Sequence, residues 1–498
     1  MGLEQPRMRR RHGLDLTTHQ QAFAYQLQAV EAAKDRPYAA IFHEQGLGKT
    51  KIGIDLALEW LRVDAVDAVM IVTKLSLIQN WAEEIAAHSH LRPKVLSQDH
   101  SANFYGFNSA APLFLAHYEV MRSEERRLAM FLRTRRVAVV LDESQKIKNP
   151  DAELSKSLHR LAPAFHRRVI MSGTPVANRP YDLWSQIFFL DQGKALGTDF
   201  EAFKEGLDLT NDLWKSPSAQ EKFAVELGSL HARIADFAIR ETKRSAGIEL
   251  PEKRVENVVV ELEEKQRLLY DTIRTELEAT VQSDGVMVVD DAESALKRLL
   301  RLVQVASNPR LVDQSYDRTP GKLSKLLQLV GDAVGGGSKV IVWTSFVDNA
   351  TWLADRLAEH HAVVVHGGLE IDERQESIRA FKQDDQVSVL VATPGAAKEG
   401  LTLTVANHAV FYDRSFSLDD YLQAQDRIHR ISQKQTCFVW NLVAKDTIDE
   451  WVEALLTAKR LAAQLAQADM NVQDYVSAAN YDFGKMVVEI LGGAVDDE

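Results

Sequence analysis

Short runs of apolar, often β-branched residues alternate with helical patterns in two stretches of the chain. In the first stretch the runs are Ala39–Phe42, Ala68–Val72, Pro112–Ala116, Val137–Leu141 and Arg168–Met171. In the second stretch they are Lys339–Trp343, Ala362–Val365, Val387–Val391, His408–Tyr412 and Cys437–Val443. Continuous apolar strands separated by helices are typical of parallel sheets that are covered on both faces. Each stretch is therefore predicted to form a doubly wound α/β domain.

The region between the two stretches carries helical patterns and sets the expected division of the chain. These patterns are Glu201–Leu207, Ala219–Leu227, Glu263–Val281 and Ala292–Val305, with a break at Ser283–Asp291. Gly335–Gly337 resembles a flexible joint before the second sheet. We expect a basic N-terminal tail, a first lobe with a helical insertion at about 195–235, a helical protrusion and linker, a second lobe, and a C-terminal tail. Their respective ranges are 1–18, 19–245, 246–335, 336–480 and 481–498.

Composition places the chain among globular proteins outside the membrane. Its 498 residues are 45% hydrophobic and 26% charged, which is ordinary for a globular protein. No apolar run approaches the roughly 20 residues that span a bilayer. No apolar stretch follows the basic residues near the N-terminus, so this segment does not have the pattern of a secretory signal. Cys437 is the only cysteine, so no internal disulfide can form, which fits a reducing compartment. We expect a cytoplasmic monomer with no membrane contact.

Net charge alone does not point to a nucleic-acid partner. The formal net charge is −12, whereas a DNA-binding protein usually shows a basic footprint. Such a footprint can be local, and four short basic clusters are present. They are Arg7–Arg11, Arg133–Arg136, Arg240–Arg244 and Lys297–Arg301. Each cluster by itself is more typical of an ordinary solvated surface than of a phosphate contact.

A phosphate-binding loop is predicted directly after the first apolar run. The sequence is His43, Glu44, Gln45, Gly46, Leu47, Gly48, Lys49 and Thr50. Glycines in such a loop let backbone N–H groups turn inward, and the following helix N-terminus favours anions. Lys49 would reach the β- and γ-phosphates of ATP, and Thr50 would bind Mg²⁺. The alternative is a chance Gly-Lys-Thr in a surface loop, and His43 stands where the general pattern begins with glycine.

Two carboxylates follow the run Val137–Leu141. Asp142, at the end of the strand, can hold Mg²⁺ through water, and Glu143 can orient and deprotonate an attacking water. An Asp-Glu pair after a strand is by itself also a common helix cap. The phosphate-binding loop upstream favours the catalytic interpretation.

Two arginines in the second domain could complete a nucleotide site. Arg427 and Arg430 are three residues apart, so on a helix they would share a face. Two guanidinium groups on one face could reach a triphosphate held by the other lobe, which is an arginine-finger arrangement. The alternative is a solvated basic helix face.

The order of these motifs resembles the Swi/Snf-like branch of the superfamily-two helicases. The resemblance covers roughly Tyr25 to Trp451, and its most specific piece is Gln423–Gln433. The matching segments are Tyr25-Gln26, the phosphate-binding loop, Thr73–Trp81, Asp142–Gln145, Ser172–Pro175, Ile239–Arg244, Leu250–Lys253, Ser307–Pro309, Val340–Phe346, His366–Gly368, Gly400–Thr404 and Gln423–Gln433.

The resemblance implies a fold and roles for particular residues. It implies two RecA-like lobes that hold ATP and Mg²⁺ between them, with helical insertions. Tyr25 and Gln26 would lie on the adenine side, Gln26 reading the base. Gln145, Ser172 and Thr174 would couple the nucleotide site to the DNA track. Gly400 would lie where the second lobe meets ATP and DNA, and Arg427 and Arg430 would complete the site.

Several positions depart from the pattern of that family. Gln145 stands where histidine is usual, and His43 where aspartate is usual. Gly395 and Lys398 replace an arginine and a glycine ahead of Gly400, which affects the expected DNA contact of the second lobe. Ser432, where glycine is usual, is a small change.

The sequence thus predicts a DNA-dependent ATPase that translocates on double-stranded DNA. A strand-separating or strand-annealing helicase of the same fold is the first alternative. A nucleotide-gated switch that recruits a partner, or a degenerate scaffold, is a further alternative, which the complete set of catalytic residues argues against. A motor with no added module resembles bacterial or viral members, so a bacterial or phage-infected cell is expected.

Overall fold

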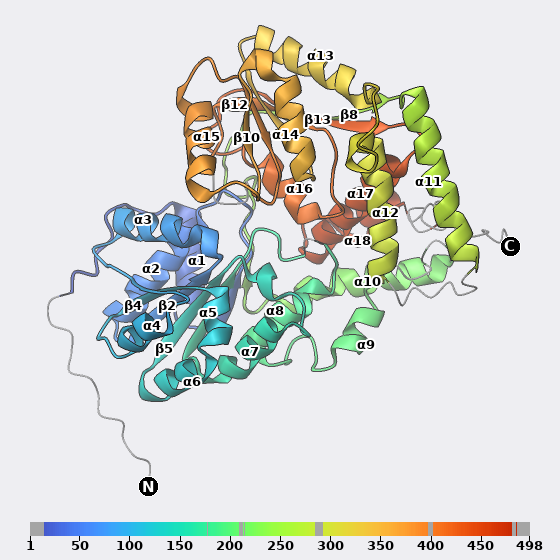
Figure 1. The fold of residues 1–498 in the computed structure, drawn as a ribbon. Coiled ribbons are helices and arrows are strands. Elements are labelled where there is room, and N and C mark those ends of the chain that lie inside the picture. The colour runs from blue at the N-terminus through green and yellow to red at the C-terminus, as the bar shows by residue number, and fades with distance from the viewer. Residues whose placement is uncertain are drawn as a thin grey trace. The chain divides into compact units, whose positions relative to one another are not determined.

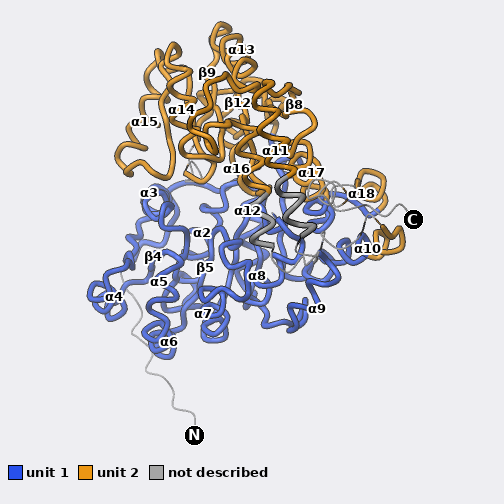
Figure 2. Tube along the Cα trace, turned by 45° about the vertical axis from the view of Figure 1, so that its right-hand side comes forward, with its two compact units in different colours: residues 1–208, 223–248, 462–472 blue, residues 209–222, 249–461, 473–498 orange. Residues whose placement is uncertain are grey.

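The computed structural model describes residues 14–176, 178–208, 213, 215–283, 292–396, 402–480 and 485, with side chains described outside 276–298. The chain divides into two compact units (Figure 2). Unit 1 comprises Met1–Asp208, Phe223–Ile248 and Ala462–Val472. Unit 2 comprises Leu209–Lys222, Glu249–Leu461 and Gln473–Glu498.

Unit 1 contains a parallel sheet, of which β4, β2 and β5 are labelled in Figure 1. Its described strands follow the order β3-β4-β2-β5-β6-β1-β7. The strands are β1 Tyr38–Ile41, β2 Ala68–Thr73, β3 Lys94–Leu96, β4 Leu113–His117, β5 Val137–Asp142, β6 Arg167–Met171 and β7 Ala238–Ile239. All five apolar runs expected in the first stretch form strands. The strands β3 and β7 were not predicted, because segments of three and two residues at the sheet edges carry no recognisable apolar run.

Helices pack on this sheet in two groups. The first group is α1 Ala24–Ala33, α2 Lys49–Arg62 and α3 Ile78–His88. The second is α4 His100–Phe107, α5 Tyr118–Ser123, α6 Glu125–Thr134, α7 Glu153–Leu161 and α8 Asp182–Asp191, followed by α9 Phe200–Glu205 and α10 Pro217–Ile234. Short 3-10 helices lie at η1 Leu75–Leu77, η2 Ser144–Ile147 and η3 Ala162–Ala164. The patterns expected at Glu201–Leu207 and Ala219–Leu227 correspond to α9 and α10.

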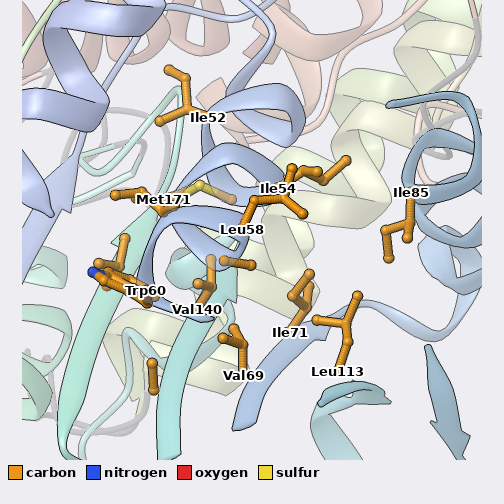
Figure 3. Close-up of a cluster of buried hydrophobic side chains, with 14 of the residues drawn as sticks. Ile52, Ile54, Leu58, Trp60, Val69, Ile71, Ile85, Leu113, Val140 and Met171 are labelled. Atoms are coloured by element: carbon orange, nitrogen blue, oxygen red, sulfur yellow. The ribbon is translucent and has the colours of Figure 1, made fainter. Parts of the chain in front are cut away.

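A buried apolar cluster fixes α2 against the sheet, and so fixes the segment that precedes this helix. Ile52 and Leu58 of α2 pack with Ile71 of β2, Val140 of β5 and Met171 of β6 (Figure 3). Full burial of one such side chain stabilises the fold by roughly 1.5–3 kcal/mol. The N-terminus of α2 is therefore held rigidly at the end of β1.

Unit 2 contains a second parallel sheet, with the strand order β10-β11-β9-β12-β13-β8. The strands are β8 Lys253–Val260, β9 Lys339–Trp343, β10 Val363–Val365, β11 Val389–Ala392, β12 Ala406–Phe411 and β13 Cys437–Ala444. The five runs expected in the second stretch all form strands. The edge strand β8 was not predicted, since it lies in the stretch expected to be helical. Its apolar run, Val258–Val260, is short, and most residues of the strand are exposed.

The helices of this part of the chain include the two expected in the central region. They are α11 Glu264–Ser283, α12 Ala292–Ser307, α13 Gly321–Gly335, α14 Val347–Arg356, α15 Ile371–Gln383, α16 Leu418–Gln425, α17 Ile448–Ala466 and α18 Val472–Ala478, with 3-10 helices η5 Pro309–Leu311 and η6 Ala358–His360. Leu326 and Val330 of α13 pack with Leu353 of α14 and Val340 of β9 in the core of unit 2. Among the described residues, no helix has both the length and the apolar character that crossing a membrane requires.

The glycines at 335–337 end a helix and do not form the expected flexible joint. Gly335 is the last residue of α13, and Gly337 adopts φ +80°. The Gly337 and Ser338 N–H groups donate to the Val334 and Ala333 carbonyls at 2.9 and 3.0 Å. This is the hydrogen-bonded helix end that a left-handed glycine allows. The expectation was wrong because a glycine run before a strand also serves as a helix cap.

Candidate nucleotide-binding site

The predicted phosphate-binding loop lies between β1 and α2, as expected. Gly46 and Gly48 have φ angles of +85° and +69°, in the left-handed region that favours glycine. A Cβ at Gly48 would lie 2.4 Å from the Gln26 side-chain nitrogen, so a larger residue would also displace the end of the Gln26 side chain. Helix α2 begins at Lys49, and the partial positive charge of a helix N-terminus makes this end attractive to an anion.

The Lys49 ammonium group lies inside the loop. Its Nζ donates to the His43 and Glu44 carbonyl oxygens at 3.0 and 3.4 Å. A Cβ at Gly173 would lie 3.1 Å from the same Nζ, so the segment after β6 also closes on this cation. The positive charge is thus held where the phosphates of a nucleotide are expected to bind.

His43, which stands where the family usually has aspartate, is not a charged group. Its side chain is buried, and burial together with the nearby Lys49 charge lowers the pKa of His43 from 6.5 to about 4. The imidazole is therefore neutral at pH 7. His43 therefore adds no charge beside Lys49.

Asp142 is the last residue of β5 and is buried beside the loop. Its Oδ2 accepts hydrogen bonds from Thr73 Oγ1 at 3.1 Å and from Trp81 Nε1 at 2.8 Å. Burial and the adjacent Glu143 charge raise the pKa of Asp142 from 3.8 to about 6. A metal ion bound here would reverse this shift, since a cation favours the ionised carboxylate.

Thr73, Trp81 and Tyr118 are supporting residues to which the sequence assigned no role. Tyr118 Oη donates to the Asp142 backbone carbonyl at 2.7 Å. Thr73 and Trp81 begin and end a segment that the resemblance had marked as a motif, and that was the only signal. Nothing in the sequence pointed to Tyr118, because its contact depends on how β4 and β5 lie in the sheet.

Glu143 and Gln145 adopt a specific local geometry. Glu143 has φ +55°, which is rare for a residue with a side chain and costs on the order of 1–2 kcal/mol. Its Oε2 accepts a hydrogen bond from Gln145 Nε2 at 2.5 Å. Backbone strain at a carboxylate beside a phosphate-binding loop is typical of a catalytic position.

Gln145, Ser172 and Thr174 lie together as the resemblance implied. Ser172 Oγ donates to Gln145 Oε1 at 2.9 Å and accepts from the Thr174 N–H at 3.1 Å. A continuous chain of hydrogen bonds therefore links the Glu143 carboxylate to the segment after β6. Gln145 has both a donor and an acceptor in its amide, so it can bridge the two groups without titrating.

On the expected adenine side, Gln26 is tied to the loop. Its Oε1 accepts from the Phe23 N–H at 2.9 Å, and its Nε2 donates to the Leu47 carbonyl at 3.1 Å. The rings of Phe23 and Tyr25 stack at 5.8 Å between centroids, and Tyr25 is buried. Gln26 is thus held at the loop, with an amide that can pair with the N6 and N7 edge of adenine.

Arg427 and Arg430 belong to unit 2 and do not lie on a helix. Helix α16 ends at Gln425, and both arginines lie in the turns that follow. The helical expectation failed because Asp426 caps α16 before either arginine. Arg430 donates from Nε to the Asp426 carbonyl at 3.0 Å and from Nη1 to Thr402 Oγ1 at 2.8 Å. Burial lowers the pKa of Arg430, and Arg427 is only 4% exposed. Lys398 and Gly400 lie outside the described residues.

Several residues of the basic clusters in unit 1 form ion pairs. Arg136 pairs with Asp67 at 2.8 Å, and Lys243 pairs with Glu44 at 3.3 Å. Arg240 pairs with Asp469. Arg7–Arg11 lie outside the described residues. Arg240 and Lys243 of the cluster Arg240–Arg244 thus support the loop, and Arg244 is exposed.

Models of two known families match the chain. The model of the SNF2-related domain matches residues 25–311, and that of the helicase conserved C-terminal domain matches residues 321–432. These two ranges contain the phosphate-binding loop and the two arginines, respectively.

Individual relatives are distant in sequence. An uncharacterized ATP-dependent helicase of Mycoplasma genitalium is 26% identical over 430 residues, which are 85% of this chain and 40% of the relative. The TATA-binding protein-associated factor MOT1 of Saccharomyces cerevisiae is 25% identical over 74% of this chain and 22% of its own length. The chain therefore spans less than half of these relatives. The Sulfolobus solfataricus SWI2/SNF2 ATPase core, solved in complex with dsDNA, is 23% identical over 97% of this chain and 99% of that chain, with a TM-score of 0.41.

Proposed function

The chain belongs to the SNF2-related family, and from this premise we propose that it is a DNA-dependent ATPase that moves along double-stranded DNA. The observation that carries the proposal is the constellation in unit 1. Gly46 and Gly48 give the loop its conformation, and the loop holds the Lys49 ammonium group. Strand β5 ends at the buried Asp142, and Glu143, with its strained backbone, comes next. This set of groups suits the hydrolysis of a nucleoside triphosphate.

The donor set also fits a magnesium ion. The Thr50 hydroxyl and the Asp142 carboxylate are hard oxygen ligands, the kind that Mg²⁺ prefers, usually with several retained waters. We propose that these two residues hold the ion that accompanies ATP. When bound, Mg²⁺ would neutralise charge on the phosphate oxygens. Glu143 would orient the attacking water and take its proton.

The remaining roles follow the order of the motifs. Lys49 and the loop N–H groups would bind the phosphates, and Gln26 would bind adenine with Tyr25 beside it. Arg427 and Arg430 are proposed to stabilise the charge that develops on the transferred phosphoryl group. Such arginines contribute on the order of 10³–10⁵ in rate when they act as fingers. Ser172 and Thr174, with Gln145, would link hydrolysis to the DNA track.

Double-stranded DNA is the proposed track. The names of the relatives, an ATP-dependent helicase and a TATA-binding protein-associated factor, both support an activity on DNA. A motor needs contacts that position it without reading sequence, and phosphate contacts do this. The net charge of −12 then predicts few such contacts. Binding should therefore be modest and fade above physiological salt, with log affinity falling by about 0.9 per unit of log salt for each phosphate contacted.

The proposal is tested by ATP hydrolysis with and without duplex DNA. Wild-type protein should hydrolyse ATP in the presence of Mg²⁺, and duplex DNA should raise the rate. Lys49→Ala should lose both ATP binding and hydrolysis, because the loop loses its cation. Lys204→Ala, which removes a solvent-facing cation of α9 in the same unit, is the matched control and should behave as wild type. Hydrolysis that survives in Lys49→Ala would contradict the proposed site.

A further inference from the structure

Arg240 joins the first residue before the phosphate-binding loop to a segment from much later in the chain. Its Nη1 donates to the Phe42 carbonyl at 2.6 Å. Its Nε and Nη2 donate to the two carboxylate oxygens of Asp469 at 3.2 and 2.5 Å. The arginine and aspartate side chains are 16% and 23% exposed, so water screens the pair only in part. A two-point guanidinium–carboxylate pair fixes both charge and orientation.

The segment after Arg240 holds the loop itself. The Glu44 N–H donates to the Glu241 carbonyl at 2.8 Å, and the Lys243 N–H donates to Glu44 Oε2 at 2.8 Å. The Phe42 N–H donates to the Ile239 carbonyl at 2.9 Å. Phe42 and Glu44 flank His43, so the entrance of the loop takes its shape from Ile239–Lys243. A change at Arg240 should therefore affect Lys49, because Arg240 binds the Phe42 carbonyl and Lys49 binds the carbonyls of the next two residues, His43 and Glu44.

Asp469 is aimed at Arg240 by the end of helix α17. The Asp469 N–H donates to the Gln464 carbonyl at 2.9 Å, and the Ala468 N–H donates to the Leu465 carbonyl at 3.1 Å. Ala468 has φ +58°, a conformation that usually needs glycine at this position of a helix end. The strained alanine turns the chain sharply and places the carboxylate of the next residue beside the guanidinium group.

The segment is packed closely within unit 1. A Cβ at Gly228 of α10 would lie 2.8 Å from a methyl group of Val472. A small cavity of about 10 Å³ is bordered by Phe42 and Arg240, by Ala466 and Gln467, and by Val176 beyond the Ser172–Pro175 motif. The end of α17 thus lies beside both the start of the loop and the coupling segment.

We propose that Asp469 is a positioning residue for ATP binding, acting through Arg240 on the Phe42 carbonyl and hence on the phosphate-binding loop. This inference rests on the proposed ATPase function and extends it. Helix α17 begins among the residues of unit 2, and Ala462–Val472 belongs to unit 1. The residues at and after the C-terminal end of this helix are thereby linked to the loop. The Arg240–Asp469 ion pair sets how well the loop is formed for a triphosphate.

The test compares Asp469→Asn with Glu125→Gln. Glu125 makes an equally two-pointed pair with Arg160, at 2.7 Å for both bonds, in the same unit and away from the loop. Asp469→Asn should raise the KM for ATP about three- to tenfold and leave kcat within twofold, which is the size of effect that network residues commonly have. Glu125→Gln should change neither constant. Asp469→Glu, which keeps the carboxylate, should recover most of the affinity.

Hydrogen exchange separates positioning from general stability. Amides of residues 42–50 should exchange faster in Asp469→Asn than in wild type or in Glu125→Gln. The melting temperatures of the three proteins should be equal, which shows that general stability is unchanged. On an Arg240→Lys background, where two-point pairing is impossible, Asp469→Asn should have no further effect on KM. Unchanged KM and unchanged exchange in Asp469→Asn would overturn the inference alone. A wild-type protein that binds no ATP would overturn the proposed function and the inference with it.

Discussion

Gln145 donates a hydrogen bond from its side-chain amide to the Glu143 carboxylate, with Nε2 and Oε2 2.5 Å apart. Because Ser172 holds the other end of the amide, Gln145 fixes the carboxylate in one orientation. Gln145→Leu removes both bonds at similar volume and should lower kcat about tenfold or more, with the KM for ATP within twofold. Gln145→His restores one donor and one acceptor and should recover most of the rate. Steady-state kinetics of the two variants check this, and equal rates for Gln145→Leu and wild type would contradict the role.

Asp142→Asn should stabilise the protein without nucleotide while removing its activity. Both donors, Thr73 and Trp81, reach the same oxygen, so an asparagine carbonyl can accept both. A pKa of about 6 in place of 3.8 corresponds to about 3 kcal/mol of unfavourable ionisation in the folded state at neutral pH. Removing that charge should therefore raise the free energy of unfolding by about 1–3 kcal/mol at pH 8.

The pH dependence of this gain has a definite sign. Between pH 4 and 6 the folded wild type binds more protons at Asp142 than the unfolded chain does, so its stability falls as pH rises through this window. The difference between variant and wild type should be small near pH 4, grow with pH, and level off above about 6. Denaturant unfolding at pH 4.5, 6 and 8 measures it, and a gain that does not depend on pH would contradict the assignment.

Glu143→Gln should separate ATP binding from hydrolysis. The amide cannot take a proton from water, but it leaves Lys49 and the loop unchanged. We expect ATP affinity close to that of wild type and turnover reduced by at least about 10²-fold, as for the loss of a general base. Equilibrium binding of a fluorescent ATP analogue beside single-turnover hydrolysis measures both quantities. Normal turnover would remove Glu143 as the base.

The sequence predicted the central strands and marked the residues of the candidate nucleotide site in unit 1, because both depend on short, local patterns. The apolar run that begins at Val137 and the glycines around Lys49 are examples, because each of these patterns is contained in a few consecutive residues. The edge strand β8 and the pairing of Arg240 with Asp469 were not predicted. Strand β8 is mostly exposed and has only a short apolar run at its end, and the Arg240–Asp469 pair joins residues 229 positions apart.

The turn that carries Arg427 and Arg430 marks another limit of local patterns. Their spacing suited a helix, but α16 ends before them, and Arg430 binds Thr402 and the Asp426 carbonyl. A three-residue spacing also occurs in a tight turn, so spacing alone does not choose between the two. The contact with Thr402 depends on the strand order of the second sheet, which no local pattern encodes.

Arg427→Ala and Arg430→Ala should each leave ATP affinity within a few fold and reduce DNA-stimulated turnover severely. The expected loss lies on the order of 10³-fold if either guanidinium group stabilises the transferred phosphoryl group. Arg356→Ala, at the end of α14 in the same unit, is a control that removes a cation packed on Trp352. Turnover that survives both substitutions would contradict a site completed by unit 2.

The central claim is that double-stranded DNA is the track, and ATP hydrolysis on three tracks tests it most directly. Hydrolysis should be measured without DNA, with single strands, and with duplex at equal nucleotide concentration. Triplex displacement and forked-duplex unwinding should be run in parallel. The account predicts the highest rate with duplex and displacement of a third strand without separation of the duplex. Stronger stimulation by single strands, together with unwinding of the fork, would contradict it and favour a strand-separating helicase.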